Sequence, residues 1–144
     1  MERRAFIKST CNVCLLGATG YLLTSLSACG PAAFPVLKTE IVNDEIQLPL
    51  SALSTSNLHL VRPKGWYYDI AVQKKEDAGY EAILLKCTHQ DNQLSATGKG
   101  YTCSLHGSQF DKDGRVTKGP AERSLKQFRT SVSQDILIIH TQAY

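Results

Sequence analysis

Apolar and polar residues alternate in several short segments of the chain. The segments at 46–48 and 58–60 each place polar residues between apolar ones. Residues 66–72 are rich in aromatic and β-branched side chains, and 80–86 is a further apolar run that follows a polar stretch at 74–79. A period of two places apolar side chains on one face of a strand. We therefore predict strands in these four segments and a turn at 74–79.

The C-terminal part of the chain continues this pattern. Residues 125–132 and 136–140 read as two strands of a hairpin around the polar residues 133–135. No long segment shows the 3.6-residue apolar period of an amphipathic helix. Short strands separated by turns are typical of a small antiparallel sandwich or barrel. The pattern thus predicts an all-β domain.

The N-terminal residues have a different character. Arg3 and Arg4 precede an apolar pair and a lysine, which resembles a twin-arginine export signal. The apolar stretch at 11–26 is too short and too weakly apolar for a membrane-spanning helix, which needs about 20 strongly apolar residues. It fits the apolar region of a signal peptide.

This stretch ends in Leu26-Ser27-Ala28-Cys29, which resembles a bacterial lipobox. The resemblance implies cleavage before Cys29 and attachment of lipid to that cysteine, which would hold the protein at a membrane of the cell envelope. We expect a signal peptide at 1–28, a lipidated tether at 29–40 and a folded domain at 41–144. An uncleaved signal anchor is the alternative.

Charge changes this picture little. The formal net charge is +3, and no basic stripe with interleaved aromatic residues indicates a nucleic-acid partner.

The candidate chemistry lies in two short motifs. Cys87-Thr88-His89 is followed after 13 residues by Cys103-Ser104-Leu105-His106. Each motif pairs a thiol with an imidazole, so two facing loops would supply two sulfur and two nitrogen ligands. Such a donor set suits iron–sulfur clusters, zinc or copper.

The motifs resemble those of the Rieske iron–sulfur family. The resemblance extends to Gly107, Ser108, Phe110 and Asp111 after the second motif, and to Gly119-Pro120-Ala121, which matches the loop that covers the cluster. It implies a Rieske-type β-sandwich or barrel with a cluster-binding loop subdomain, one [2Fe–2S] cluster, and one-electron transfer to or from an unidentified redox partner protein.

The same resemblance assigns roles to individual residues. Cys87 and Cys103 would bind the inner iron, and His89 and His106 would bind the outer iron near solvent. Histidine ligands raise the reduction potential to about −150 to +300 mV, against about −400 mV for plant-type clusters.

Groups around the ligands would tune that potential. Ser108 would donate to a bridging sulfide, or else cap a nearby amide, and Gly107 and Pro120 would shape the surrounding loops. Phe110 stands where high-potential members have a tyrosine that donates to a ligand sulfur. The resemblance therefore predicts an intermediate potential.

The sequence departs from the quinol-oxidising members of the family in one further respect. Asn92 and Leu105 occupy the positions of two cysteines that form a disulfide there. We expect packing and hydrogen bonds to hold the loops instead. A quinol-oxidising subunit of a respiratory complex is therefore possible but not favoured.

Other interpretations are open. The four ligands could hold structural zinc in a surface binding module, or Cys87 and Cys103 could form a disulfide. Oxygenase chemistry would need a second iron site, and the remaining histidines, His59 and His140, have no cysteine nearby. We expect an electron-transfer protein rather than an enzyme.

Overall fold

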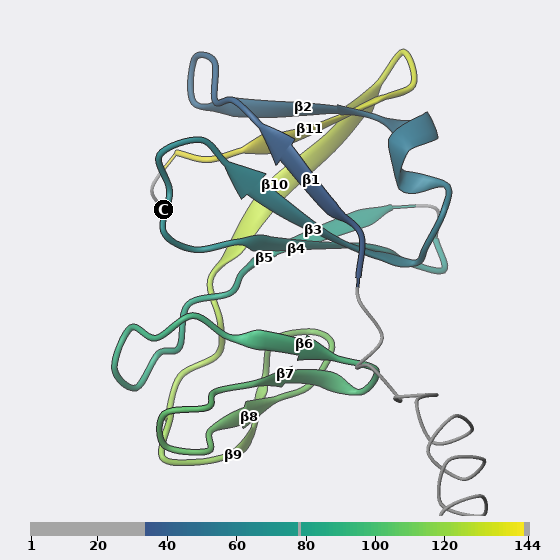
Figure 1. The fold of residues 1–144 in the computed structure, drawn as a ribbon. Helices are drawn as coiled ribbons and strands as arrows, with labels where there is room; N and C mark the ends of the chain where they lie inside the picture. Colours follow the sequence, from purple (N-terminus) through teal and green to yellow (C-terminus); the bar gives the residue numbers. More distant parts are fainter. Residues whose placement is uncertain (1–33, 78, 143–144) are drawn as a thin grey trace, which may run out of the picture. The chain divides into compact units, whose positions relative to one another are not determined.

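The computed structural model describes residues 34–77 and 79–142, which form a domain built almost entirely of strands. Figure 1 shows the strands in two layers. The strands of these residues are β1 (Val36–Thr39), β2 (Glu45–Pro49), β3 (Leu58–Pro63), β4 (Ile70–Lys74), β5 (Tyr80–Leu84), β6 (Ser95–Thr97), β7 (Gly100–Thr102), β8 (Gln109–Phe110), β9 (Val116–Lys118), β10 (Gln127–Ser133) and β11 (Ile136–His140). A short 3₁₀ turn, η1 (Leu50–Leu53), follows β2.

Seven strands form one sheet in the order β1-β3-β4-β5-β10-β11-β2. Its two edge strands, β1 and β2, are consecutive in the chain, so the sheet is nearly closed into a barrel. The turn between them contains Asn43 and Asp44, both with left-handed backbone angles, and the β10–β11 turn contains Gln134 and Asp135 in the same conformation. Two successive left-handed residues are typical of tight hairpin turns. The hairpin around 133–135 is thus confirmed.

The alternation of apolar residues explains the first core. Ile46 and Leu48 on β2, and Leu137 and Ile139 on β11, are buried at every second position. Each of these side chains contributes about 1.5–3 kcal/mol when it leaves water. The first core comprises Ile46, Leu48, Leu53, Val61, Ile70, Val72, Ala82, Leu84, Phe128, Leu137 and Ile139.

Strands β4 and β5 are buried on both faces. Ile70 and Val72 face the first core, whereas Ala71 between them belongs to a second core. Successive side chains of a strand point to opposite faces, so one strand can serve two cores. The second core comprises Ala71, Ile83, Leu85, Cys87, Leu94, Tyr101, Cys103, Phe110, Ala121 and Leu125.

The second core lies between β4–β5 and a four-stranded sheet in the order β6-β7-β8-β9. This smaller sheet and its loops are inserted between β5 and β10, and those two strands pair directly through Ile83 and Gln127. The all-β prediction and the predicted loop subdomain are therefore confirmed.

Two strand boundaries differ from the predictions. The strand predicted at 66–72 begins at Ile70, because Gly65 adopts φ +82° and the Trp66 N–H bonds back to the Pro63 carbonyl, which makes a turn. Trp66 instead packs against the first core, with its ring 6.0 Å from that of Phe128.

The end of the predicted tether is also a strand. β1 lies within 29–40 and pairs in parallel with β3, from Val36 opposite Leu60 to Thr39 opposite Pro63. The sheet therefore begins before residue 41, and this pair is the exception to its antiparallel pairing. In the described part of the chain, no helix has the length and apolar character needed to cross a bilayer.

Candidate metal centre

The two cysteines of the motifs lie close together beneath the surface. Cys87 follows β5 and Cys103 follows β7, and their side chains are only 1% and 3% exposed. Both thiols are free, so the alternative of a Cys87–Cys103 disulfide does not hold in this structure. Their sulfur atoms are within hydrogen-bonding contact. Two ligating sulfurs thus face one position from two loops.

The loops that carry these cysteines have the same internal hydrogen bonds. The Cys87 carbonyl accepts from the Asp91 N–H, and the Cys87 N–H donates to the Asn92 carbonyl. In the second loop, the Cys103 carbonyl accepts from the Gly107 N–H, and the Cys103 N–H donates to the Ser108 carbonyl. Each cysteine is therefore bonded to the residues four and five positions further along.

The fourth position after each cysteine has a left-handed backbone. Gly107 has φ +77° and Asp91 has φ +50°. Glycine adopts this conformation without steric cost, and aspartate tolerates it better than most residues. The requirement for Gly107 therefore comes from the turn rather than from space, since an added Cβ would meet nothing within 4 Å.

The two histidines of the motifs face solvent. His89 and His106 are exposed, and their rings meet edge to face with centroids 5.0 Å apart. The imidazoles therefore form an outer pair, whereas the two thiols form a buried inner pair. His59 and His140 take no part: His59 is buried beside Thr55, and His140 contacts Glu45 and Ser131.

Hydrogen-bond donors surround the sulfur of Cys103. Burial raises the pKa of this thiol, but the backbone N–H groups of Leu105 and His106, the Cys87 thiol and the Asn92 side chain lower it more. The net effect is a lowered pKa. The thiolate is the form that binds metals, so these donors favour the ligating state.

A third loop joins the two ligand loops. The Ser108 hydroxyl oxygen accepts a 3.1 Å hydrogen bond from the N–H of buried Ala121, and the Thr88 hydroxyl donates to the Arg123 carbonyl at 2.6 Å. Pro120 precedes Ala121, is exposed and follows a cis peptide bond. Ser108 thus caps an amide, as one of its two predicted roles requires, while its own proton is left for another acceptor.

Phe110 is buried in the second core with both cysteines. It lies on β8 opposite Tyr101 of β7, and it carries no group that could donate to sulfur. Burial, with smaller contributions from Glu81, Asp113 and Asp111, raises the pKa of Tyr101, so this neighbouring phenol stays protonated.

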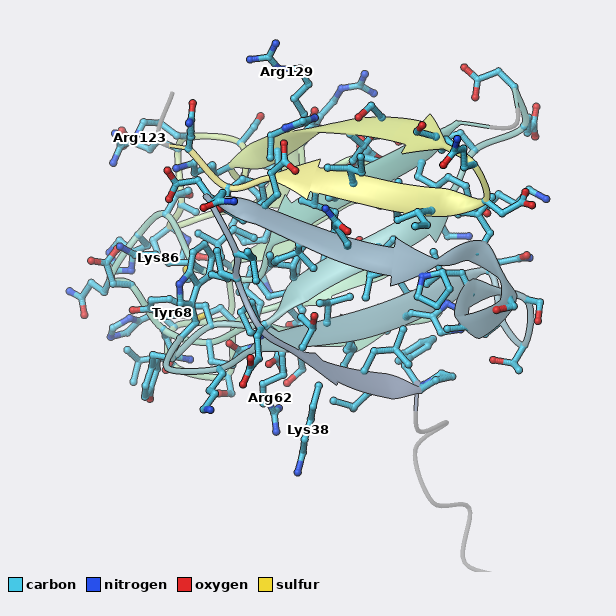
Figure 2. The ribbon with its side chains drawn as sticks, turned by 90° about the horizontal axis from the view of Figure 1, so that it is seen from above. Lys38, Arg62, Tyr68, Lys86, Arg123 and Arg129 are labelled. Carbon is cyan, nitrogen blue, oxygen red and sulfur yellow. The ribbon has the colours of Figure 1, made fainter. Side chains whose placement is uncertain are left out.

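Contacts from the large sheet hold the first ligand loop. The Tyr68 hydroxyl donates to the Asp91 carbonyl at 2.5 Å, and Lys86 pairs with the Asp91 carboxylate at 3.1 Å. The Lys86 ammonium lies 5.4 Å from the centre of the Tyr68 ring, and Figure 2 shows the two side chains at the same end of the molecule. These bonds are of the kind expected in place of a disulfide.

Two polar residues near the ligands have contacts that the sequence analysis did not assign. Thr88 bonds to the covering loop, and the Asn92 amide nitrogen lies 3.6 Å from the Cys103 sulfur. The signal for Asn92 is its spacing: it follows Cys87 by five residues, as Ser108 follows Cys103.

The donor set fits a two-iron cluster. In Rieske centres two cysteines bind one iron and two histidines bind the other. The inner thiol pair and the outer imidazole pair follow this division. Among the described residues, no three His, Cys, Asp or Glu side chains converge on one metal position; a two-and-two arrangement requires no such convergence.

The remaining predicted residues, Arg3 and Arg4 of the export signal and Cys29 of the lipobox, lie outside the described residues.

Comparison with known proteins supports the same family. The model of the Rieske [2Fe–2S] domain matches residues 51–129, more than half of the chain. The cytochrome b6-f complex iron-sulfur subunit of Nostoc punctiforme is 37% identical over 75 residues, which are 49% of this chain and 40% of that protein. The corresponding subunit of Synechococcus elongatus is 35% identical over 68 residues, 46% of this chain and 38% of that protein. The chain therefore spans about two fifths of these relatives.

Solved structures show the same fold. The plasma membrane Rieske protein PetC3 from Synechocystis PCC 6803 superposes with a TM-score of 0.53 at 23% identity, covering 63% of this chain and 93% of that one. A chain from the complex of reduced oxygenase and oxidized ferredoxin in carbazole 1,9a-dioxygenase gives a TM-score of 0.53 at 18% identity, covering 72% and 98%. Fold, ligand spacing and the matching domain model agree: this chain belongs to the Rieske [2Fe–2S] domain family, whose members bind a [2Fe–2S] cluster.

Proposed function

We propose that this chain is an electron carrier that exchanges single electrons with a redox partner protein through one [2Fe–2S] cluster. One observation supports this most strongly: two free, buried thiols in contact lie beneath two exposed imidazoles in contact. That arrangement supplies two sulfur and two nitrogen ligands in two separate pairs, as the family's cluster requires.

The residues divide the work of binding and access. Cys87 and Cys103 would hold the inner iron in a dry environment, and His89 and His106 would hold the outer iron. When bound, the cluster supplies a one-electron redox couple. Because both imidazoles are exposed, a partner protein could approach the outer iron through them. The chain offers no second donor group for substrate chemistry among the residues discussed, so we propose a carrier or small redox subunit rather than an enzyme.

Metal analysis of the purified protein tests this proposal. Protein produced with ample iron and sulfide should contain two irons and two acid-labile sulfides per chain, the stoichiometry of one [2Fe–2S] cluster. It should be brown and give a reduced-state EPR signal of the Rieske type. Zinc without iron would instead support the zinc-stabilised binding module. Protein that takes up neither iron nor sulfide would refute the electron-carrier function.

We also propose that the protein is exported and attached to a membrane of the bacterial cell envelope. Arg3 and Arg4 would direct export, and cleavage before Cys29 would leave a lipidated cysteine at the start of a tether. Several acyl chains hold a protein at a membrane where one chain does not. Mass spectrometry of the mature protein should find an acylated N-terminal Cys29. An unmodified chain that begins at Met1 would refute this proposal.

The names of the relatives favour a second candidate, a subunit of a quinol-oxidising complex, because they are iron–sulfur subunits of the cytochrome b6-f complex. Phe110, Asn92 and Leu105 argue against it, since they remove the tyrosine and the disulfide of quinol-oxidising members. Voltammetry separates the two. A quinol-oxidising subunit should lie near the upper end of the range of about −150 to +300 mV, whereas we expect an intermediate value.

A further inference from the structure

We infer that Asn92 is a positioning residue that sets the reduction potential of this centre by donating a hydrogen bond from its side-chain amide to the sulfur of Cys103. The inference rests on the proposed function, because it concerns a thiolate that ligates iron. It assigns a role to a residue that stands where related proteins have a disulfide cysteine.

The contact itself has the geometry of a donor to sulfur. The Asn92 Nδ2 atom lies 3.6 Å from the Cys103 Sγ atom and 3.1 Å from the Gln93 carbonyl oxygen. Both neighbours are acceptors, so the amide nitrogen and not the amide oxygen must occupy this position. One N–H bond would fix the amide on its own loop, and the other would point across to the second loop.

The backbone holds this amide in place. The Asn92 carbonyl accepts from the Cys87 N–H at 2.8 Å, which closes the first ligand loop. The Tyr68 hydroxyl and Lys86 fix the preceding residue, Asp91. Asn92 is half-buried, so water competes only partly for its N–H groups. The donor is therefore preorganised.

The position of Asn92 mirrors that of Ser108. Each follows a ligand cysteine by five residues, and each has a backbone carbonyl that accepts from that cysteine's N–H. Ser108 carries a hydroxyl at its place and Asn92 carries an amide. The two ligand loops would thus supply one polar side chain each to the sulfur side of the centre.

The expected effect on the potential follows from charge. A donor to a thiolate stabilises the more negative, reduced state more than the oxidised state, because hydrogen bonds to charged groups strengthen with charge. Asn92 should therefore raise the potential. It would supply part of what Phe110 cannot supply, since a phenyl ring has no donor.

Three variants test the inference by voltammetry. Asn92→Leu keeps the approximate size and removes the donor, so the potential should fall, by up to about 59 mV for a tenfold change in the one-electron equilibrium. Asn92→Asp also removes the donor and adds a negative charge, so it should fall further. Tyr68→Phe loosens the same loop through Asp91 without touching sulfur, so the potential should stay near that of the parent.

The outcomes separate this inference from the proposed function. Iron and sulfide content of the parent decides whether the protein carries a cluster at all. Given a loaded parent, an unchanged potential in Asn92→Leu, or an equal fall in Tyr68→Phe, would overturn the role of Asn92.

The parent protein provides a measurement that does not depend on the variants being loaded. Pulsed EPR of the reduced parent, grown with isotopically labelled asparagine, should detect a nitrogen coupled to the cluster through the N–H···S bond. Among the described residues, the other asparagines are Asn43 and Asn57, in the β1–β2 turn and before β3. A loaded parent without this coupling would overturn the inference.

Discussion

The Thr88 hydroxyl donates a 2.6 Å hydrogen bond to the carbonyl oxygen of Arg123, and this bond joins the first ligand loop to the loop that contains Pro120. The second ligand loop reaches the same segment through Ser108 and Ala121. One covering loop therefore restrains both halves of the centre. In this chain Asn92 and Leu105 replace a disulfide, so such bonds carry more of the restraint.

Replacing Thr88 should test that restraint. Thr88→Val keeps the shape of the side chain and removes the hydroxyl, so the free energy of unfolding should fall by about 1 kcal/mol. Chemical denaturation measures this loss. Thr117→Val, at an exposed position on β9, is the matched control and should change stability little. Equal effects of the two variants would show that the loop bond contributes nothing specific.

The assignment of the histidine ligands can be tested by comparing His106→Ala with His140→Ala. Loss of an imidazole from the outer pair should abolish or severely reduce iron content, because one iron would lack a ligand. His140 contacts Glu45 and Ser131 on the large sheet, so its replacement should leave iron content near that of the parent. Full iron content in His106→Ala would contradict the assignment. His89→Ala should behave as His106→Ala does.

Ser108 and Phe110 should move the reduction potential in opposite directions. Ser108→Ala removes a hydroxyl donor and should lower the potential, whereas Phe110→Tyr adds a hydroxyl beside buried sulfur and should raise it. Voltammetry measures both shifts. No movement in either variant would show that these positions do not tune the centre by hydrogen bonding.

Ser108→Ala should also have a cost in stability. The Ser108 oxygen accepts from the buried Ala121 N–H, and an unpaired buried donor costs about 1–3 kcal/mol. Chemical denaturation should therefore show a loss of this size. Phe110→Tyr leaves the Ala121 bond intact, so only Ser108→Ala should lose this particular contribution.

His59 predicts a pH dependence of stability. Its side chain is 1% exposed, and burial lowers its pKa below 6.5. The unfolded state therefore binds a proton at a higher pH than the folded state does. Stability from this group is present above pH 6.5, the pKa of the unfolded state, and is lost as the pH falls through the folded pKa.

The measurement is the free energy of unfolding as a function of pH. His59→Gln keeps a polar partner for Thr55 and does not titrate, so the decrease below neutral pH should be smaller in this variant than in the parent. The same decrease in both proteins would show that other groups cause it.

Much of the large sheet could be predicted because its residues alternate. Ile46 with Leu48 and Leu137 with Ile139 mark buried faces in the sequence, and the polar residues between them mark the exposed ones. β1 could not be predicted in this way. It is a four-residue edge strand directly after Pro35, and its parallel pairing with β3 depends on a partner distant in the sequence.

The ligands could be predicted and most of their surroundings could not. The spacing of Cys87, His89, Cys103 and His106 is specific, because it repeats a thiol and an imidazole within a few residues. The strands β6 to β9 are two or three residues long, which is too short to show a period. The contact between Asn92 and Cys103 crosses from one loop to the other, so it depends on how the loops pack.

The direct pairing of Ile83 with Gln127 has a consequence for how such proteins can diversify. The polypeptide leaves the barrel at β5 and returns at the adjacent β10, so the intervening segment behaves like a cassette with its two ends side by side. Loop lengths and side chains within that cassette can change while the neighbouring strands keep their register. The scaffold and the redox properties can then be altered separately, provided that the interface to Ala71 and Ile83 stays filled.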